Sequence, residues 1–131
     1  MNSNVSVISR CFEKLAEMNV DVTASIYSAY LSAMPEVTEH IEYLDDRMKG
    51  RMLDQVYRLL LDDVDNDYLS FEARTHRCYG ATVARYKGLL NAVKTTFKEQ
   101  LGASWTAEDE QAWDASISRI LADIERVNLA A

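Results

Sequence analysis

Residues that interrupt helices are scarce in this chain, which has one proline and four glycines among its 131 residues. Strands and hairpins need such residues at their turns. Apolar residues also recur at intervals of three and four, which is the period of an amphipathic helix. The sequence therefore predicts an all-α protein. Its length suits one core, and we expect residues 1–131 to form a single domain.

The charge and composition disfavour several classes of function. Acidic residues outnumber basic residues by 21 to 14, which gives a formal net charge of −7, and the basic residues are scattered. Nucleic-acid binding is disfavoured because it requires clustered Lys and Arg side chains. No apolar run approaches the ~20 residues of a membrane span, and Met1-Asn-Ser-Asn lacks the pattern of a signal peptide. We therefore expect a cytoplasmic protein that does not contact a membrane.

Two further features argue against a built metal or disulfide site. Cys11 and Cys78 are too few and too far apart for a disulfide scaffold or a zinc site, so we expect each to pack as a small apolar residue. The acidic run at 62–67 lacks the glycine and the terminal glutamate of an EF-hand. We interpret it as a solvated loop.

The first part of the chain predicts two helices and a short helical segment. The first helix ends near Asn19, and the second covers about residues 21–34 with Asp21 as its N-cap. Pro35 disfavours helical geometry at the residue before it and suits the first turn of a new helix. We expect this short segment to end near Ile41.

The rest of the chain predicts four more helices. A long helix covers about 44–63, a shorter one about 68–78, and a third ends at Gly102, a favourable C-terminal residue. Thr106 and Asp109 approximate a capping box for the last helix. The stripe that we expect to face the core from helix 44–63 consists of Met48, Met52, Val56 and Leu59.

A bundle of such helices can be a plain interaction module without a pocket. Two features argue against that reading: the change of direction at Pro35, and the short helix with His76 between two long helices. Helices that cross at steep angles leave an interior space that parallel bundles do not.

The segment that begins at His76 has a glycine four residues later, Gly80, and a tyrosine ten residues later, Tyr86. This spacing resembles the proximal region of bacterial globins. The similarity extends over essentially the whole chain, through Met34-Pro35-Glu36-Val37, Leu89-Leu90, Leu101-Gly102, Trp105-Thr106 and Ala112-Trp113. The resemblance implies the globin fold, a three-over-three helical sandwich like that of single-domain bacterial haemoglobins and of flavohaemoglobins.

The resemblance also implies haem b (iron protoporphyrin), with His76 as the proximal iron ligand and an open sixth position for oxygen or nitric oxide. Tyr27 falls on the second-helix position that faces the bound gas. There its hydroxyl would donate a hydrogen bond of about 1.5–3 kcal/mol to a partially charged oxygen. Tyr86 matches a residue that hydrogen-bonds near the proximal histidine. The alternative for both tyrosines is an ordinary structural role.

The distal side departs from the family pattern. Ile41 stands where the family has a nearly universal phenylalanine against the haem, and Tyr43 would replace it only if the loop is shifted. Lys49, Arg51 and Met48 each fit the distal position under slightly different alignments. We prefer Lys49.

With Lys49 at the distal position, the alignment with the globin family places the residues that follow on the same helix. It puts Gly50 where two helices cross closely and Leu53 one turn further over the haem, and it leaves Asp54 next to the core. A basic distal residue could turn outward to a haem propionate or, once deprotonated in an apolar pocket, coordinate iron. His40 is a further candidate for a sixth ligand, although a surface position fits it better.

Three hypotheses of function follow. The first is a haem protein that binds oxygen or nitric oxide as a carrier, scavenger or sensor; sustained nitric oxide dioxygenation would require an external reductase. The second is a globin-fold protein without haem, related to bilin-binding or stress-sensor proteins, which Ile41 favours and the spacing after His76 opposes. The third is an interaction module. A homodimer that buries apolar helix faces is compatible with the sequence.

Overall fold

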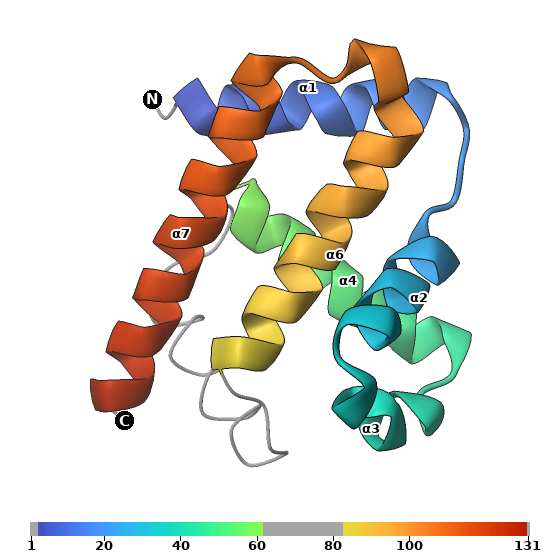
Figure 1. Cartoon of the computed structure of the whole chain (residues 1–131), viewed down its shortest axis with the longest axis vertical. Helices are drawn as coiled ribbons and strands as arrows, with labels where there is room; N and C mark the ends of the chain where they lie inside the picture. Colours follow the sequence, from blue (N-terminus) through green and yellow to red (C-terminus); the bar gives the residue numbers. More distant parts are fainter. Residues whose placement is uncertain (1–2, 62–82, 131) are drawn as a thin grey trace.

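The described part of the chain consists of helices joined by short connections (Figure 1). The computed structural model describes residues 3–61 and 83–130. In these ranges there is no strand, which confirms the all-α prediction. The elements are α1 (Ser3–Glu17), α2 (Thr23–Ala33), η1 (Pro35–Val37), α3 (Thr38–Glu42), α4 (Asp46–Leu60), α6 (Val83–Leu101), η2 (Gly102–Ser104) and α7 (Ala107–Ala130). The acidic run, the expected helix 68–78, His76, Cys78 and Gly80 lie outside the described residues.

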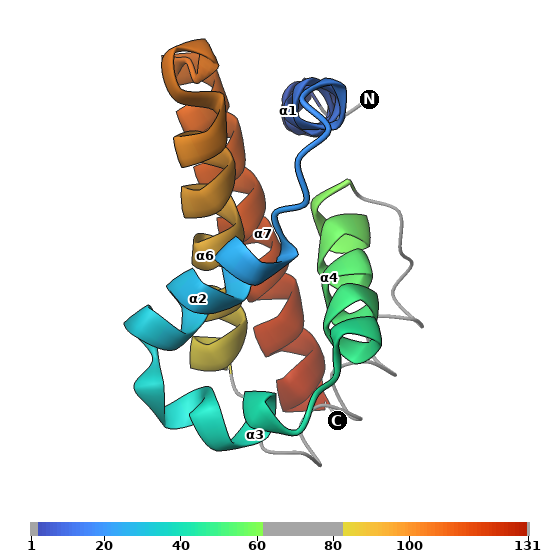
Figure 2. The ribbon, with the colours of Figure 1, turned by 90° about the vertical axis from the view of Figure 1, so that its right-hand side faces the viewer.

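The long helices cross one another at steep angles. α6 and α7 lie side by side, while α1 lies across their ends and is seen along its axis when the molecule is turned (Figures 1 and 2). α2 packs mainly on α6, and α4 contacts both α2 and α7. This arrangement agrees with the expectation of helices that cross at steep angles.

Aromatic side chains join these crossing helices. The ring centroids of Phe12 and Phe97 are 4.8 Å apart, and those of Phe12 and Tyr57 are 5.0 Å apart, both in edge-on geometry. Trp113 lies 5.1 Å from Phe97 and 5.9 Å from Trp105. Such pairs stabilise a fold by about 0.5–1.5 kcal/mol each beyond the burial of their area. The cluster therefore links α1, α4, α6 and α7.

The connections lie where the sequence places its turn residues. Asn19 follows α1 with a left-handed φ of 54°, and Gly102 follows α6 with a φ of 50°. Pro35 opens η1, which continues into α3. α2 begins at Thr23 with Val22 as its N-cap, so the prediction of Asp21 as the N-cap was wrong by one residue. The carboxylate of Asp21 nevertheless accepts the backbone N–H of Thr23 at 3.0 Å and supports the first turn of α2.

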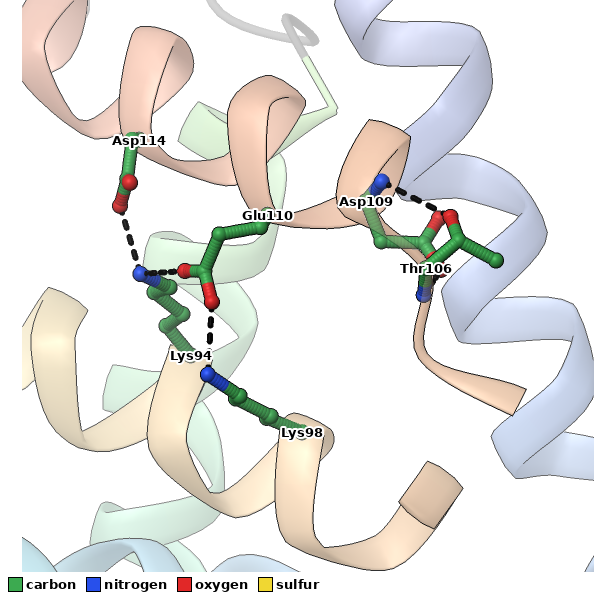
Figure 3. A network of polar contacts seen from close by, with 6 residues as sticks. All are labelled: Lys94, Lys98, Thr106, Asp109, Glu110 and Asp114. Atoms are coloured by element: carbon green, nitrogen blue, oxygen red, sulfur yellow. Dashed lines mark hydrogen bonds and ion pairs between the residues drawn. The ribbon is translucent and has the colours of Figure 1, made fainter. Parts of the chain in front are cut away.

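The start of α7 is a reciprocal capping box (Figure 3). The backbone N–H of Thr106 donates to Asp109 Oδ2 at 2.9 Å, and the backbone N–H of Asp109 donates to Thr106 Oγ1 at 3.1 Å. Two donors at the end of the helix are thereby satisfied. The prediction of a capping box is confirmed.

Charged side chains on the same turn connect α7 to α6 (Figure 3). Glu110 accepts from Lys98 Nζ at 2.6 Å and also pairs with Lys94. Lys94 in turn donates to Asp114 at 2.6 Å. Four charges thus form one network along the α6–α7 contact.

The inward face of α4 differs from the prediction. Its buried residues are Leu53, Val56 and Leu60, whereas Met48 is 46% exposed. The predicted stripe is confirmed at Val56, which is buried, and at Leu59, which packs against the core, whereas the inward-facing position of Met48 was wrong. Asp54, expected next to the core, is exposed.

α4 also begins later than predicted, at Asp46. The carboxylate of Asp45 accepts the backbone N–H of Met48 at 2.8 Å, which makes Asp45 the N-cap. An aspartate that precedes an apolar-periodic stretch is the usual signal for such a start.

The close approach predicted at Gly50 is wrong. A Cβ atom built there would have no described neighbour within 4 Å. At Gly88, in contrast, a Cβ would overlap the Sδ atom of Met34 and lie 3.2 Å from a ring carbon of Tyr30. The absence of a side chain therefore matters where α2 meets α6, and not on α4.

Candidate ligand-binding site between α2 and α4

The predicted distal side is built around Tyr27, in the middle of α2. The inward face of α2 consists of Ile26, Tyr27 and Tyr30, and the side chain of Tyr27 is 3% exposed. Its hydroxyl donates a hydrogen bond to the backbone carbonyl of Lys49 at 3.0 Å. Burial, with a smaller contribution from the neighbouring tyrosines, raises the pKa of Tyr27 well above its ordinary value. The hydroxyl therefore keeps its proton and remains a donor at neutral pH.

Lys49 is the distal candidate that contacts Tyr27. Its ammonium nitrogen lies 5.6 Å from the centroid of the Tyr27 ring, within the range of a cation–π contact. The other two candidates, Met48 and Arg51, are exposed. Of the three alternatives, the structure thus brings Lys49 to the predicted site.

Leu53 and Ile41 supply buried apolar surface on this side of the molecule. Leu53 lies one turn after Lys49 on α4 and is 1% exposed, and Ile41 of α3 is 5% exposed. Tyr43 is 84% exposed, so Ile41 and not Tyr43 faces the core. Apolar side chains with a single buried O–H donor fit a flat hydrophobic group that carries a small polar ligand. The described distal residues therefore have the chemical character that a haem-pocket wall requires.

Leu60 also lies on the buried face of α4, although the predicted stripe did not include it. Starting from Lys49, the spacings of four, three and four residues lead to Leu53, Val56 and Leu60. A helix places residues with these spacings on one side. Extending the face from Lys49, instead of from Met48, would have found the buried residues of α4.

The proximal side of the predicted site falls largely outside the described residues. His76 is not among them, and neither is the side chain of His40. Tyr86, on the first turns of α6, is partly buried and packs against the core. Within residues 3–61 and 83–130, no three His, Cys, Asp or Glu side chains gather as a ligand set for a metal ion.

A separate surface hollow of about 220 Å³ lies where α1 leads into α2. None of the predicted site residues lines it. Its walls are formed by Phe12, Leu15, Ala16, Val20, Asp21, Val22, Thr23, Tyr57 and Phe97. The Tyr27–Lys49 contact is therefore distinct from this hollow.

Comparison with known proteins identifies the family. The globin family model matches residues 50–124, which is more than half of the 131 residues. The match begins on α4, just after Lys49, and reaches far into α7. No curated protein matches the chain. None of the described helices is both long and apolar enough to cross a membrane. The helical architecture and the family match together show that this chain belongs to the globin family.

Proposed function

We propose that this globin binds haem b and, through the haem iron, a diatomic gas such as oxygen or nitric oxide. The observation that carries the proposal is the buried hydroxyl of Tyr27, which points from α2 to α4 at Lys49. A hydroxyl that is buried in an apolar core needs an acceptor; the Lys49 carbonyl supplies it in this structure, and a bound gas would take the place of that carbonyl. When bound, the haem supplies the iron centre at which a gas binds reversibly.

On the distal side, the described residues would have two roles, which are apolar contact with the haem and hydrogen bonding to the gas. Leu53 and Ile41 would contact the haem through apolar surface, since both are buried. Tyr27 would donate a hydrogen bond from its hydroxyl to a bound gas. The ammonium nitrogen of Lys49 lies 5.6 Å from the centroid of the Tyr27 ring and would place a positive charge near this donor.

On the proximal side, the spacing of His76, Gly80 and Tyr86 supports His76 as the iron ligand. Tyr86, partly buried at the start of α6, would lie near that histidine and help to orient its ring. We propose reversible binding, in a carrier, scavenger or sensor, as the main role. A sustained redox reaction would need an external reductase.

Haem binding can be tested with the only two histidines of the chain as a matched pair. We expect the haem-supplemented protein to show a Soret band and a five-coordinate ferrous spectrum. His40→Ala should leave both unchanged, and His76→Ala should lose the five-coordinate spectrum. A protein that stays colourless with haem would support the haem-free alternative. A six-coordinate ferrous spectrum that becomes five-coordinate in His40→Ala would make His40 the sixth ligand.

The role of Tyr27 has its own test. A hydrogen bond to a charged group contributes about 1.5–3 kcal/mol, so Tyr27→Phe should speed oxygen dissociation about ten- to hundredfold. Stopped-flow measurement of the dissociation rate checks this. An unchanged rate would reject the donor role without affecting the assignment of haem.

A further inference from the structure

We propose that Lys49 is a positioning residue that holds the Tyr27 hydroxyl on α4 in the ligand-free protein and thereby weakens the hydrogen bond that Tyr27 can give to a bound gas. This inference rests on the proposed function. It concerns how strongly the site retains its ligand.

The Tyr27 hydroxyl already has a hydrogen-bond acceptor in the ligand-free protein. It donates to the backbone carbonyl of Lys49 at 3.0 Å. A phenol has one O–H proton and gives a full hydrogen bond to one acceptor at a time. To donate to a gas, Tyr27 must therefore release the Lys49 carbonyl. The free-energy cost of breaking the hydrogen bond to the Lys49 carbonyl is subtracted from the stabilisation that the new hydrogen bond gives to the bound gas.

The side chain of Lys49 contacts the ring of the same tyrosine. Its ammonium nitrogen lies 5.6 Å from the ring centroid of Tyr27. A cation over an aromatic face attracts the ring electrostatically. Lys49 forms no ion pair with any described carboxylate, so nothing in this part of the structure draws its charge away from the ring.

Both contacts come from Lys49 and favour one position of the Tyr27 ring. The backbone carbonyl of Lys49 fixes the hydroxyl end, and its side chain fixes the ring face. Turning Tyr27 toward a ligand would weaken both contacts together. The side chain of Lys49 thus adds to the cost of releasing the carbonyl, although it need not touch the ligand.

The alternative is that the Lys49 ammonium itself donates to the gas. The two roles predict opposite signs for Lys49→Met, which keeps the length of the side chain and removes its charge. If Lys49 positions Tyr27, oxygen should dissociate about two- to fivefold more slowly from Lys49→Met, the factor that matches a partly exposed cation–π contact. If the ammonium is a donor, oxygen should dissociate faster.

Three comparisons complete the kinetic test. In a Tyr27→Phe background, Lys49→Met should have no effect on the dissociation rate. Lys49→Arg should behave like the unmodified protein because it keeps a cation over the ring. Arg47→Met, which removes a positive charge from an exposed position of the same helix, should change nothing. Faster or unchanged dissociation from Lys49→Met would overturn the proposal.

A second readout does not require haem. In haem-free protein with ring-labelled tyrosine, Tyr27→Phe identifies the NMR signal of Tyr27. We expect Lys49→Met to shift this signal and to speed the flipping of the ring, whereas Lys49→Arg and Arg47→Met leave it in place. An unchanged Tyr27 signal in Lys49→Met would reject the positioning role even if haem binds. Failure to bind haem would reject the proposed function and leave this measurement informative.

Discussion

The thiol of Cys11 in α1 donates to the carboxylate of Asp109 in α7 across 3.6 Å, and both side chains are buried. The same carboxylate accepts the backbone N–H of Thr106 through its other oxygen. Burial is the main cause that raises the pKa of the Cys11 thiol, which keeps the thiol protonated and able to donate. Asp109 therefore closes the first turn of α7 and joins that turn to α1.

Replacement of Asp109 should cost stability at both of these contacts. We expect Asp109→Ala to lower the free energy of unfolding by about 1–3 kcal/mol, the range for loss of a helix cap and of a buried acceptor. Glu108→Ala is the matched control, because Glu108 makes an exposed ion pair with Arg10 and should have little effect. Urea unfolding followed by circular dichroism measures both. Equal losses in the two variants would contradict this role of Asp109.

Gly50 in α4 and Gly88 in α6 should respond to the same substitution with opposite signs. Gly50→Ala should stabilise the protein by about 0.5–1 kcal/mol, because alanine favours the helix and a Cβ meets no described atom there. Gly88→Ala should destabilise it by about 1–3 kcal/mol, because its Cβ would overlap Met34 and crowd Tyr30.

A double variant separates crowding from other effects of Gly88→Ala. Adding Met34→Ala removes the overlapping sulfur, so it should cost less in the Gly88→Ala background than alone. Thermal unfolding of the haem-free single and double variants gives the comparison. If the two substitutions add independently, the close contact between α2 and α6 is not the cause.

Tyr57 should make stability decrease at high pH. Burial, followed by the charges of Asp54 and Asp21, raises the pKa of Tyr57 from 10.0 to about 12. Between these values the unfolded chain releases the phenolic proton and the folded protein keeps it, so the free energy of unfolding falls as the pH rises. Tyr57→Phe should remove this part of the loss. Urea midpoints between pH 9 and 12 test it, and equal slopes in the two proteins would contradict it.

Glu110 should titrate well below an ordinary glutamate. Its hydrogen bonds to Lys94 and then to Lys98 lower the pKa of this carboxyl from 4.5 to about 2. The stabilisation from this network is complete above pH 4.5 and is lost as the pH falls toward 2. Carboxyl-carbon NMR can follow the titration. Lys94→Met should raise the pKa of Glu110 more than Lys98→Met does, and the reverse order would show that Lys98 is the main partner.

Much of the fold could be predicted from local signals. Asn19, Pro35 and Gly102 mark connections because their backbone preferences act regardless of what packs around them. The pair Thr106 and Asp109 forms its capping box because both partners lie within one helical turn. Such features depend on neighbours in the sequence, which a sequence displays directly.

On α4, the apolar or charged character of a side chain does not by itself decide its burial. Met48 is as apolar as a core residue, and Lys49 is charged, yet Met48 is 46% exposed and Lys49 lies over the ring of Tyr27. A lysine can bury its stem and leave its ammonium at the edge of the core, so charge alone does not place it outside. The sequence also does not show which glycine lies at a close helix crossing. Tertiary packing decides this, and it selects Gly88 and not Gly50.

Part of the distal side of the site could be predicted from the sequence. The resemblance selected Tyr27, Leu53 and Ile41, and all three are buried in the structure. The hydrogen bond from Tyr27 to a backbone carbonyl could not be predicted, because it depends on the separation of α2 and α4 to within a fraction of an ångström. The iron-binding role of His76 stays a prediction.

The contact between α1 and α7 also has a consequence for how the protein is made. Cys11 and Asp109 are separated by 98 residues, so the ribosome completes α1 long before its packing partner exists. At about 5–20 residues per second, the apolar face of α1 waits for roughly 5–20 s. During that interval Ile8 and Cys11, which are fully buried in the finished fold, have no cover from α7. The nascent chain should therefore depend on chaperones most strongly just before α7 is synthesised.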